Sequence, residues 1–375
     1  MHALRCRTRP RVDKTHSEAV VVGDLEQKPI IHRLFIRVGR NHKPMESLTN
    51  IAGRHNIALG IEPAHWDDKP FFPVSVAYKK QFGSKVFKIP VSIAEDCPNR
   101  RGINGMQTCI FCDEWGSFAY PENSELALRE QIVAHRAKVA KRFNTEKFIV
   151  YFQAYTSTFT KLAELRMGFD IALESPDVVG LTVGTRPDCL SDGVLRTWKE
   201  YSEKTFMGVE FGVQSFDDDQ LIWMRRGHTA SQSIKAIERV ATAGSIDIGI
   251  HLIFGFTGET DKQIIETAKL WNSLPISNVK LHNLHVLKNT PLENLYHEKN
   301  FVPLEKLEYA HRVGLFLDHL SPNIAVHRLV ALASRWDELV APPWTRDKMR
   351  SYQEVLDYLR ANGHMQGKSV VISPR

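Results

Sequence analysis

The sequence has no long apolar segment. A helix that crosses a membrane needs about 20 consecutive, predominantly apolar residues. The most apolar stretch here, IDIGIHLIFGF, is interrupted by Asp247 and His251. A secretory signal with an apolar core is also missing from the sequence. We therefore expect neither a membrane span nor a membrane partner.

Cysteine is scarce, with five residues among 375. Together with the missing secretory signal, this argues against a disulfide framework and for a reducing compartment. The opening MHALRCRTRPRV is rich in arginine, as organellar targeting segments are, but acids return at Asp13 and Glu18. No amphipathic helix is evident there, so we expect a cytoplasmic location.

A strong excess of charge is missing as well. The net charge is +6, but residues 1–70 hold twelve of the 49 Lys and Arg and eight of the 43 Asp and Glu. The remaining chain therefore has 37 basic against 35 acidic residues. Such a balance gives no general field that attracts nucleic acid, although a local basic patch remains compatible with it. The composition, 43% hydrophobic and 25% charged, is that of a globular protein.

The chain changes in texture near residue 80. Residues 1–78 show no sustained periodicity and predict a poorly ordered or accessory extension. Beyond them, continuous apolar runs alternate with segments of helical spacing, and most intervals match one βα unit. Six such units predict an α/β fold, a partial (β/α)6 TIM-like barrel over 79–320, with a small C-terminal α/β elaboration over 321–375. The expected strands are Val86–Ile89, Phe148–Phe152, Val178–Val183, Met207–Val213, Ile246–Phe254 and Val279–Val286.

The segment DCPNRRGINGMQTCIFCDEWG follows the first expected strand. Cys97, Cys109 and Cys112 form C-x11-C-x2-C, and Gly102 and Gly105 allow the loop to fold back so that the sulfurs converge. A structural zinc site needs four ligands, and the loop has no fourth Cys or His. Three thiolates suit a [4Fe–4S] cluster with one open iron. Zinc and inert buried thiols remain the alternatives.

CIFC resembles the C-x-aromatic-C ending of the cluster loop in radical S-adenosylmethionine (radical SAM) enzymes. The wide first gap resembles that of the Elongator catalytic subunit class. Later motifs follow in the same order, and residues 81–375 resemble the YhcC-type subfamily. These motifs are YFQAYTST, VGLTVGTRPDCL, VEFGVQS, RRGHT, HLIFGFTGET, VKLHNLHVLKNTPL and IAVHRL.

The resemblance implies two cofactors, a [4Fe–4S] cluster on Cys97, Cys109 and Cys112 and S-adenosyl-L-methionine (SAM). It also implies reductive cleavage of SAM to a 5′-deoxyadenosyl radical, with an electron donor such as flavodoxin or ferredoxin. Phe111 is expected beside the adenine. Gln153 stands where most of these enzymes have a Gly-Gly-Glu motif that meets the SAM amino group.

Further SAM contacts are expected at the ends of later strands. Glu210 and Gln214 suit the ribose hydroxyls and amino group, and Arg226 suits the SAM carboxylate. A surface or loop salt bridge is the alternative for Arg226. Ile253 and Gly255 match the fifth-strand motif that presses on adenine, although Thr257 replaces its usual proline and His251 its leading glycine.

Other polar residues receive no single role from the sequence. Arg186 and Asp188 of TRPD form either a site contact or a structural salt bridge. His282 and His285 are three positions apart, so a strand directs them to opposite faces. The roles of the remaining candidates stay open: Cys189, His327 and Arg328.

The resemblance to the Elongator class indicates RNA, specifically tRNA, as substrate. A small-molecule substrate for the same radical chemistry is the second hypothesis. A non-catalytic Fe–S binding protein that retains the fold is the third. The sequence names no substrate, since a fold alone does not determine one.

Overall fold

The computed structural model describes residues 66–370 except 95, 117–119, 121–125 and 332–335. The chain divides into two units, Met1–Pro44 and Met45–Arg375, and all described residues belong to the second. Residues 1–65 of the expected N-terminal extension lie outside the described residues. Among the described residues, no helix has the length and apolarity needed to cross a membrane.

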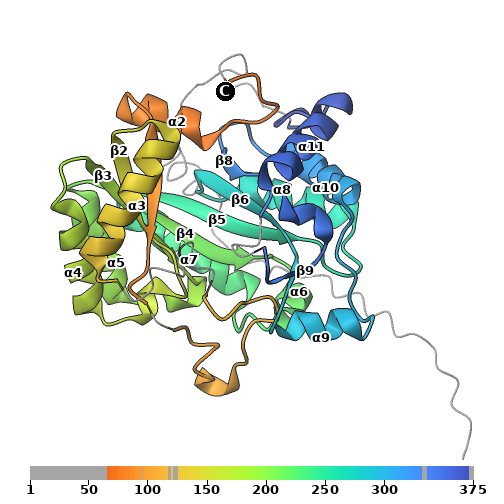
Figure 1. The fold of residues 1–375 in the computed structure, drawn as a ribbon, viewed down its shortest axis with the longest axis horizontal. Helices are drawn as coiled ribbons and strands as arrows, with labels where there is room; N and C mark the ends of the chain where they lie inside the picture. Colours follow the sequence, from red (N-terminus) through yellow and green to blue (C-terminus); the bar gives the residue numbers. More distant parts are fainter. Residues whose placement is uncertain (1–65, 95, 117–119, 121–125, 332–335, 371–375) are drawn as a thin grey trace, which may run out of the picture. The chain divides into compact units, whose positions relative to one another are not determined.

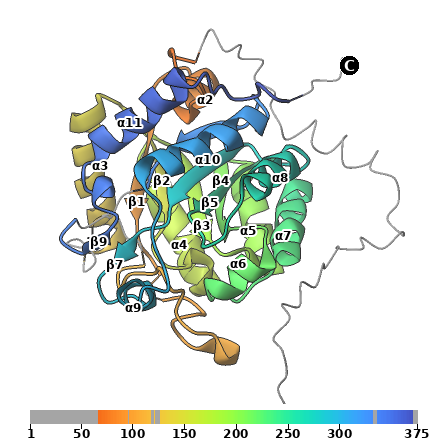
Figure 2. The ribbon, with the colours of Figure 1, turned by 90° about the vertical axis from the view of Figure 1, so that its right-hand side faces the viewer.

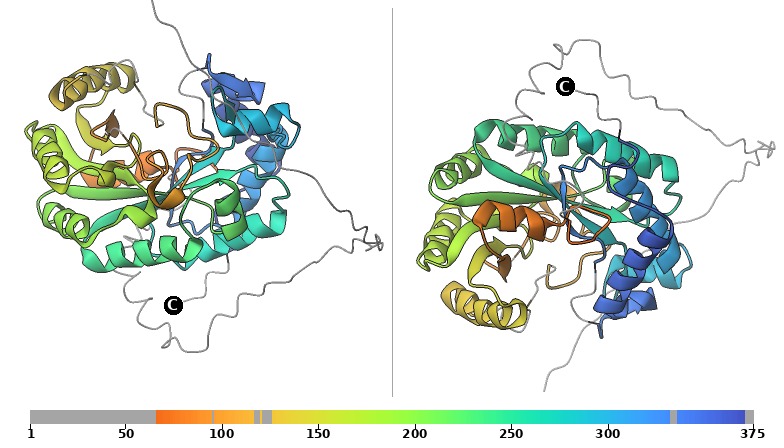
Figure 3. Two further views of the ribbon diagram at one scale, coloured as in Figure 1. Left: turned by 90° about the horizontal axis from the view of Figure 1, so that it is seen from below. Right: turned by 90° about the horizontal axis from the view of Figure 1, so that it is seen from above.

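A seven-stranded parallel sheet forms the centre of the second unit (Figure 1). Its strands are ordered β1-β2-β3-β4-β5-β6-β8, so β1 to β6 follow one another along the chain, β8 pairs with β6, and β1 and β8 are the two edges. The sheet is curved and open between those edges (Figure 3). The strands are β1 Val86–Val91, β2 Lys147–Phe152, β3 Val178–Thr185, β4 Phe206–Gln214, β5 Ile246–Phe254, β6 Asn278–Asn283 and β8 Ala325–Arg328.

This arrangement confirms the expected partial TIM-like barrel and five of its strands closely. The expected strand Val279–Val286 is wrong at its end. Strand β6 stops at Asn283, and β7 (Val286–Leu287) pairs in antiparallel fashion with β9 (Leu339–Ala341). Strand β8 adds a seventh parallel strand from the segment assigned to the C-terminal elaboration.

Helices cover the outer face of the sheet, where α3 packs on β1, α4 on β3, α5 on β4 and α7 on β5 (Figures 2 and 3). Several begin with side-chain caps that end the preceding loop. Thr229 and Gln232 form a capping box for α7, and Thr260 and Gln263 do so for α8. The helices are α2 Val74–Phe82, α3 Leu128–Phe143, α4 Leu162–Leu173, α5 Asp192–Ser202, α6 Asp218–Trp223, α7 Ala230–Ala243, α8 Asp261–Asn272, α9 Pro291–His297, α10 Lys306–His319 and α11 Lys348–Ala361.

The main core lies between the sheet and these helices. Trp198 of α5 and Trp271 of α8 are fully buried there, together with Phe169 of α4 and Phe316 of α10. Burial of such large side chains stabilises the fold by about 1.5–3 kcal/mol each. The apolar contacts thus attach the helices to the outside of the sheet and leave its inner face for other residues.

Gln366 connects the segment before α2 with the segment before β8. The backbone amide of Phe72 donates to Gln366 Oε1 at 2.8 Å, while Gln366 Nε2 donates to the carbonyl of Ile324 at 2.8 Å. Val326 of β8 in turn donates to the carbonyl of Phe72 at 2.7 Å. The segment before α2 is therefore held against β8 by residues from the far end of the sequence.

A Gly249→Ala variant tests the crowding on the inner face of β5. A Cβ at Gly249 would lie against Asn278 Oδ1, 3.1 Å from Asn278 Cγ and 3.2 Å from Glu210 Cγ. Asn278 is fixed by its hydrogen bond to Asp247, so we expect a loss of about 1–3 kcal/mol in the free energy of unfolding. Urea denaturation measures it.

Gly168→Ala in α4 is the matched control. Its Cβ would meet only ordinary contacts, at 3.4–3.7 Å, and alanine favours a helix over glycine by about 0.5–1 kcal/mol. Equal stability changes in the two variants would contradict the crowding at Gly249.

Candidate functional site

The loop after β1 folds back on itself. Gly102 and Gly105 have φ angles of 65° and 77°, which glycine adopts without steric cost. The buried Asn99 then fastens the loop, because its Nδ2 donates to the carbonyls of Gln107 at 2.7 Å and Arg225 at 2.6 Å. The reversal predicted from the two glycines is present, and it is anchored to the segment that follows α6.

Three thiols lie on this loop. Cys97 and Cys109 are buried, Cys112 is partly buried, and none forms a disulfide. Burial raises the pKa of Cys112, and so do the thiols Cys109 and Cys97. Across the described residues, no group of three or more His, Cys, Asp or Glu is arranged to hold a single metal ion.

Arg226 lies directly against the cysteine loop. Its Nη1 donates to Cys109 Sγ at 3.2 Å and its Nη2 to the carbonyl of Gly212 at 2.7 Å. The guanidinium carbon is 5.9 Å from the centroid of the Phe111 ring. Arg226 is only 7% exposed and its buried Nε has no hydrogen-bond partner. The buried position of Arg226 therefore excludes a salt bridge at the surface, and its contact with the SAM carboxylate stays a prediction.

Gln214 lies at the C-terminal end of β4, on the same side of the sheet as Arg226. Its φ of 71° is unusual for a residue with a side chain, and the register of β4 against β5 is shifted there. The side-chain Oε1 is buried and has no partner. An unpaired buried acceptor is costly, so Gln214 is suited to receive a donor from a bound molecule.

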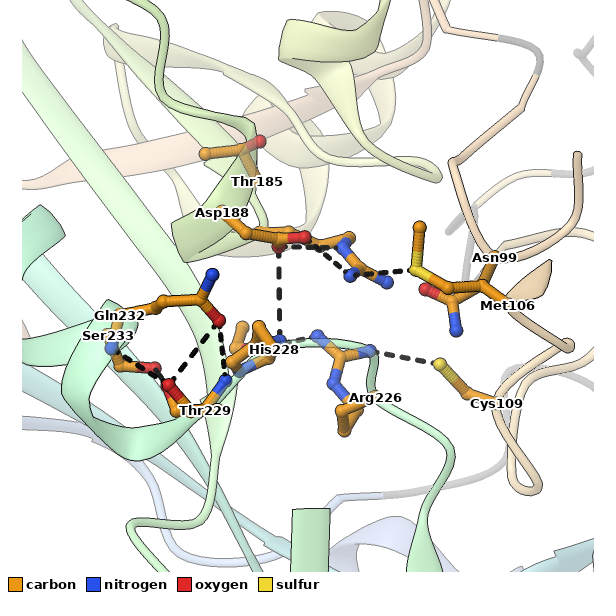
Figure 4. A network of polar contacts seen from close by, with 12 residues as sticks. Asn99, Met106, Cys109, Thr185, Asp188, Arg226, His228, Thr229, Gln232 and Ser233 are labelled. Atoms are coloured by element: carbon orange, nitrogen blue, oxygen red, sulfur yellow. Dashed lines mark hydrogen bonds and ion pairs between the residues drawn. The ribbon is translucent and has the colours of Figure 1, made fainter. Parts of the chain in front are cut away.

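Arg186 and Asp188 form a salt bridge, one of the two alternatives that the sequence left open. Arg186 Nε and Nη2 donate to the two Asp188 oxygens at 3.0 and 2.8 Å. His228 Nδ1 is 3.9 Å from Asp188, and Figure 4 shows His228 between Asp188 and Arg226. Burial lowers the pKa of His228 to about 3. The pair and the neutral histidine thus surround Arg226 on the side away from Cys109.

The expected adenine-side residues lie in two neighbouring places. Ile253 is buried in an apolar cluster with Ile110, and Phe111 packs against that cluster. Gly255 has a φ of 114°, and its backbone amide donates to Glu259 at 2.9 Å. Gly255 also lines a hollow of about 380 Å³ at the outer end of β5.

Gln153 follows β2 at the same edge, where its backbone amide donates to the carbonyl of Val91 at 3.1 Å. The adjacent Tyr155 has a φ of 53°, and its backbone amide donates to Gly116 of the cysteine loop at 3.0 Å. The position after β2 is therefore tied to the same loop. The SAM contact expected of Gln153 stays a prediction.

Glu210 lies farther from the C-terminal end of its strand than the sequence suggests. It is in the middle of β4, 2% exposed, and its carboxylate forms ion pairs with Lys88 and Lys280. His251 Nε2 lies 2.9 Å from its second oxygen. Burial alone raises the pKa of Glu210, but Lys280, Lys88 and His251 hold it well below its usual range. Its predicted SAM contact stays a prediction, and its lone pairs already have partners.

The histidines whose roles the sequence left open lie near Glu210 and its ion-pair partners Lys88 and Lys280. His327 Nε2 is 3.5 Å from Lys88 Nζ. The rings of His251 and His282 are 5.2 Å apart, and Arg328 Nη2 contacts the His282 ring at 2.6 Å. His285 lies beyond the end of β6, with a buried Nδ1 that has no partner.

A His285→Asn variant is expected to flatten the acid side of the stability profile. Burial, aided by Arg328, lowers the pKa of His285 to about 4. The unfolded chain therefore binds this proton more tightly, so the stability is full above about pH 6.5 and falls as the pH drops from 6.5 toward 4. In the variant, the slope of the free energy of unfolding against pH should be smaller by up to about 1.4 kcal/mol per pH unit.

Urea denaturation at a series of pH values between 7 and 4.5 measures the slope. His297→Asn, which changes a 64% exposed histidine on α9, is the control and should keep the wild-type slope. Identical slopes for His285→Asn and the wild type would contradict the burial of a neutral His285.

Sequence reasoning assigned no role to several residues of the inner cluster. These residues were Lys88, Tyr151, Lys280 and, next to Arg226, His228. The signal for Lys88 and Lys280 was a lysine in the middle of a strand, in VFKIPV and in NVKLHN. Buried strand positions rarely hold an unpaired lysine, so two of them indicate a shared partner in the interior.

Comparisons with known proteins match most of the described chain. The Radical SAM superfamily profile matches residues 91–270, and the Radical_SAM C-terminal domain profile matches residues 276–361. The uncharacterised protein MJ0486 of Methanocaldococcus jannaschii is 35% identical over 301 residues, 79% of this chain and 91% of its own. The protein YhcC of Escherichia coli is 31% identical over 292 residues, 78% of this chain and 92% of its own.

Two more distant similarities involve the Elongator class. The tRNA uridine(34) acetyltransferase of Methanocaldococcus infernus is 29% identical over 136 residues, 35% of this chain and 24% of its own. The structure of an N-terminally truncated Elp3 from the same organism superposes with a TM-score of 0.58 at 17% identity. That superposition covers 75% of this chain and 64% of the Elp3 chain, and it shows a shared fold.

Proposed function

Because the chain belongs to the radical SAM superfamily, we propose that it is an enzyme that holds a [4Fe–4S] cluster on Cys97, Cys109 and Cys112 and cleaves SAM reductively. The membership confirms the resemblance drawn from CIFC and the motifs that follow it. When bound and reduced, such a cluster supplies the electron that splits the sulfonium into methionine and a 5′-deoxyadenosyl radical. A cytoplasmic location and a flavodoxin or ferredoxin as electron donor belong to the same proposal.

The observation that carries the proposal is the set of three thiols without a disulfide on the loop after β1, with Arg226 against one of them. Thiolates are the ligands of Fe–S clusters, and the remaining iron takes a ligand from elsewhere. A guanidinium 3.2 Å from Cys109 Sγ stabilises negative charge on the sulfur. Hydrogen bonds of this kind raise the reduction potential of a cluster.

The residues around the loop support a SAM site. Arg226 keeps a buried Nε without a partner, which suits a carboxylate, and Gln214 Oε1 is an unpaired acceptor that suits an ammonium. Phe111 and Ile253 provide an apolar surface for an adenine. These side chains bind and orient SAM in the proposal and exclude water from its sulfonium.

For the substrate we propose RNA, specifically tRNA. The support is the similarity to the tRNA uridine(34) acetyltransferase, which is limited to 35% of this chain. The second candidate is a small molecule, favoured by the charge balance of the chain beyond residue 70. A non-catalytic Fe–S binding role is the outcome that remains if SAM is not cleaved.

The test is the formation of 5′-deoxyadenosine. The full chain, reconstituted with iron and sulfide without oxygen, is reduced in the presence of SAM, with and without bulk tRNA. We expect product above the level of the cluster-free protein and a several-fold increase with tRNA. Product that tRNA leaves unchanged would favour the small molecule. A full iron content without product would contradict the enzyme and leave the binding role.

A further inference from the structure

The inner face of the barrel differs from that of an ordinary (β/α) barrel. Such barrels are filled by layers of large branched side chains. Here three glycines occupy positions beside the charged centre of the sheet: Gly184 and Gly249 are the register partners of Glu210, and Gly212 follows it two residues later on β4. A Cβ at any of the three would meet neighbouring atoms within 3.3 Å, so glycine lets the surrounding groups approach these strands closely.

Charged and aromatic side chains from five strands surround Glu210. We call this set the lumen cluster and define it by its members. They are Lys88 of β1, Tyr151 of β2, Glu210 of β4, His251 of β5, Lys280 and His282 of β6, and His327 and Arg328 of β8. Lys88, Lys280 and His251 retain 13%, 12% and 17% of their side-chain exposure, so water reaches the cluster.

The charges of the lumen cluster do not balance. Lys88, Lys280 and Arg328 provide three cations, whereas Glu210 is its one carboxylate. Burial lowers the pKa values of His251, His282 and His327, so these rings add no charge near neutral pH. Asp247, at the start of β5, is a second acid nearby. Its oxygens accept hydrogen bonds from the neutral Ser277 and Asn278, and even with it the cations remain in excess.

The excess charge is concentrated near Lys280 and Arg328. Lys280 Nζ lies 4.3 Å from the centroid of the Tyr151 ring, and Arg328 Nη2 contacts a histidine ring. Arg328 Nε is buried and has no hydrogen-bond partner. Burial and the neighbouring cations Lys88 and Arg328 lower the pKa of Lys280 to about 7, although Glu210 raises it. Arg328 therefore has a buried donor without a partner, and Lys280 shares its one carboxylate, Glu210, with Lys88.

We propose that the lumen cluster is a binding site for an anionic group, a phosphate or carboxylate, of the molecule on which the enzyme acts, with Lys280 and Arg328 as its ligands. The statement that the bound molecule is the substrate of the enzyme rests on the function proposed above. The binding of an anion by these residues does not depend on that function. A dianionic phosphate would neutralise the excess charge and accept from Arg328 Nε.

The position of the site fits a substrate beneath SAM. Glu210 and Gly212 are two residues apart on one strand, which separates their levels by about 6.5 Å. Gly212 accepts from Arg226, which in turn contacts Cys109. The register also pairs His282 with Ile253, the residue expected beside adenine. An anion at Arg328 would therefore hold the rest of a molecule between the lumen cluster and the cysteine loop.

Pyridoxal 5′-phosphate is a probe that reads the site without SAM cleavage. Its aldehyde condenses with a lysine amine and releases water, and borohydride reduces the imine to a stable secondary amine that peptide mass spectrometry locates. Pyridoxal has the same aldehyde without the phosphate. Labelling of Lys280 by each reagent, on the full chain with its cluster, is divided by labelling of the 83% exposed Lys262 in the same sample.

We expect the normalised labelling of Lys280 to be at least about tenfold greater with the phosphate than without it, the factor that one charge-assisted hydrogen bond supplies. Arg328→Gln should remove this preference, and Arg328→Lys, which keeps the charge, should retain most of it. Arg350→Gln on the exposed face of α11 is the matched control and should change nothing. Equal preference at Lys280 and Lys262, or no labelling of Lys280, would overturn the proposal.

Competitors distinguish the sources of the anion. Inorganic pyrophosphate should protect Lys280, and failure to protect would overturn the proposal. Additional protection by bulk tRNA would assign the anion to RNA, and its absence would assign it to a small molecule. Protection by SAM that equals protection by pyrophosphate would show the site to be that of the SAM carboxylate and overturn a separate substrate site. Labelling remains readable even if 5′-deoxyadenosine never forms, so the two proposals fail separately.

Discussion

A Cys109→Ala variant is expected to lose its iron and to form 5′-deoxyadenosine at no more than background, a fall of at least about 100-fold. Changes to residues that only support a metal ligand typically cost 10–100-fold, and Cys109 is proposed as a ligand itself. Its thiol is buried and accepts a hydrogen bond from Arg226 Nη1 at 3.2 Å. Without the sulfur, the guanidinium faces a methyl group and the proposed cluster loses one of its three proposed protein ligands.

Cys189→Ala is the control for this variant. Cys189 is another free, partly buried thiol, in the short helix Pro187–Cys189 after β3, and burial raises the pKa of Cys189 to about 12. It lies outside the cysteine loop, so the variant should keep its full iron content and the absorbance of the cluster. Iron loss in Cys189→Ala equal to that in Cys109→Ala would contradict the assignment of the three loop cysteines as the complete protein ligand set.

A Glu210→Gln variant is expected to lower the free energy of unfolding by about 3–5 kcal/mol, the usual cost of removing one partner from a buried ion pair. The glutamine fits the same volume but leaves Lys88 and Lys280 without a counter-charge in the interior. The loss comes mainly from those two stranded cations. Equilibrium denaturation by urea, followed by circular dichroism, measures it.

Glu200→Gln is the matched control, because Glu200 also contacts two cations, Arg166 and Lys204, but at the surface of α5. Exposed ion pairs contribute little, so its stability should equal that of the wild type within error. Adding Lys280→Met to Glu210→Gln should recover part of the loss, since one stranded cation is removed. Wild-type stability of Glu210→Gln would refute a charged Glu210 at the centre of the barrel.

The strands of the barrel were predictable because most of their residues are buried and apolar, in continuous runs between segments of helical spacing. Strands β2 and β5 match the expected runs within one residue. The end of β6 was not predictable, because Leu284 and Val286 continue the apolar pattern while the chain leaves the sheet to pair with β9. The family of the chain followed from local motifs, which need no knowledge of packing.

The lumen cluster was harder to predict for a physical reason. Lys88 and Glu210 are 122 residues apart, and Glu210 and Lys280 are 70 apart. Their meeting depends on the register of every strand between them, which one sequence does not determine. For the same reason Glu210 was assigned to the end of its strand, whereas Gln214, four residues later, occupies that end.

The contact between Phe72 and Gln366 also sets an order of events during synthesis of the protein. The two residues are separated by 294 positions, which a ribosome translates in about 15–60 s at 5–20 residues per second. For most of that interval the nascent chain has its first strand but not β8, and throughout it lacks the glutamine that holds the segment before α2 against β8. Lys88 has no ion-pair partner until Glu210, 122 residues later, has been translated, and the seven-stranded sheet is complete only after β8 has emerged.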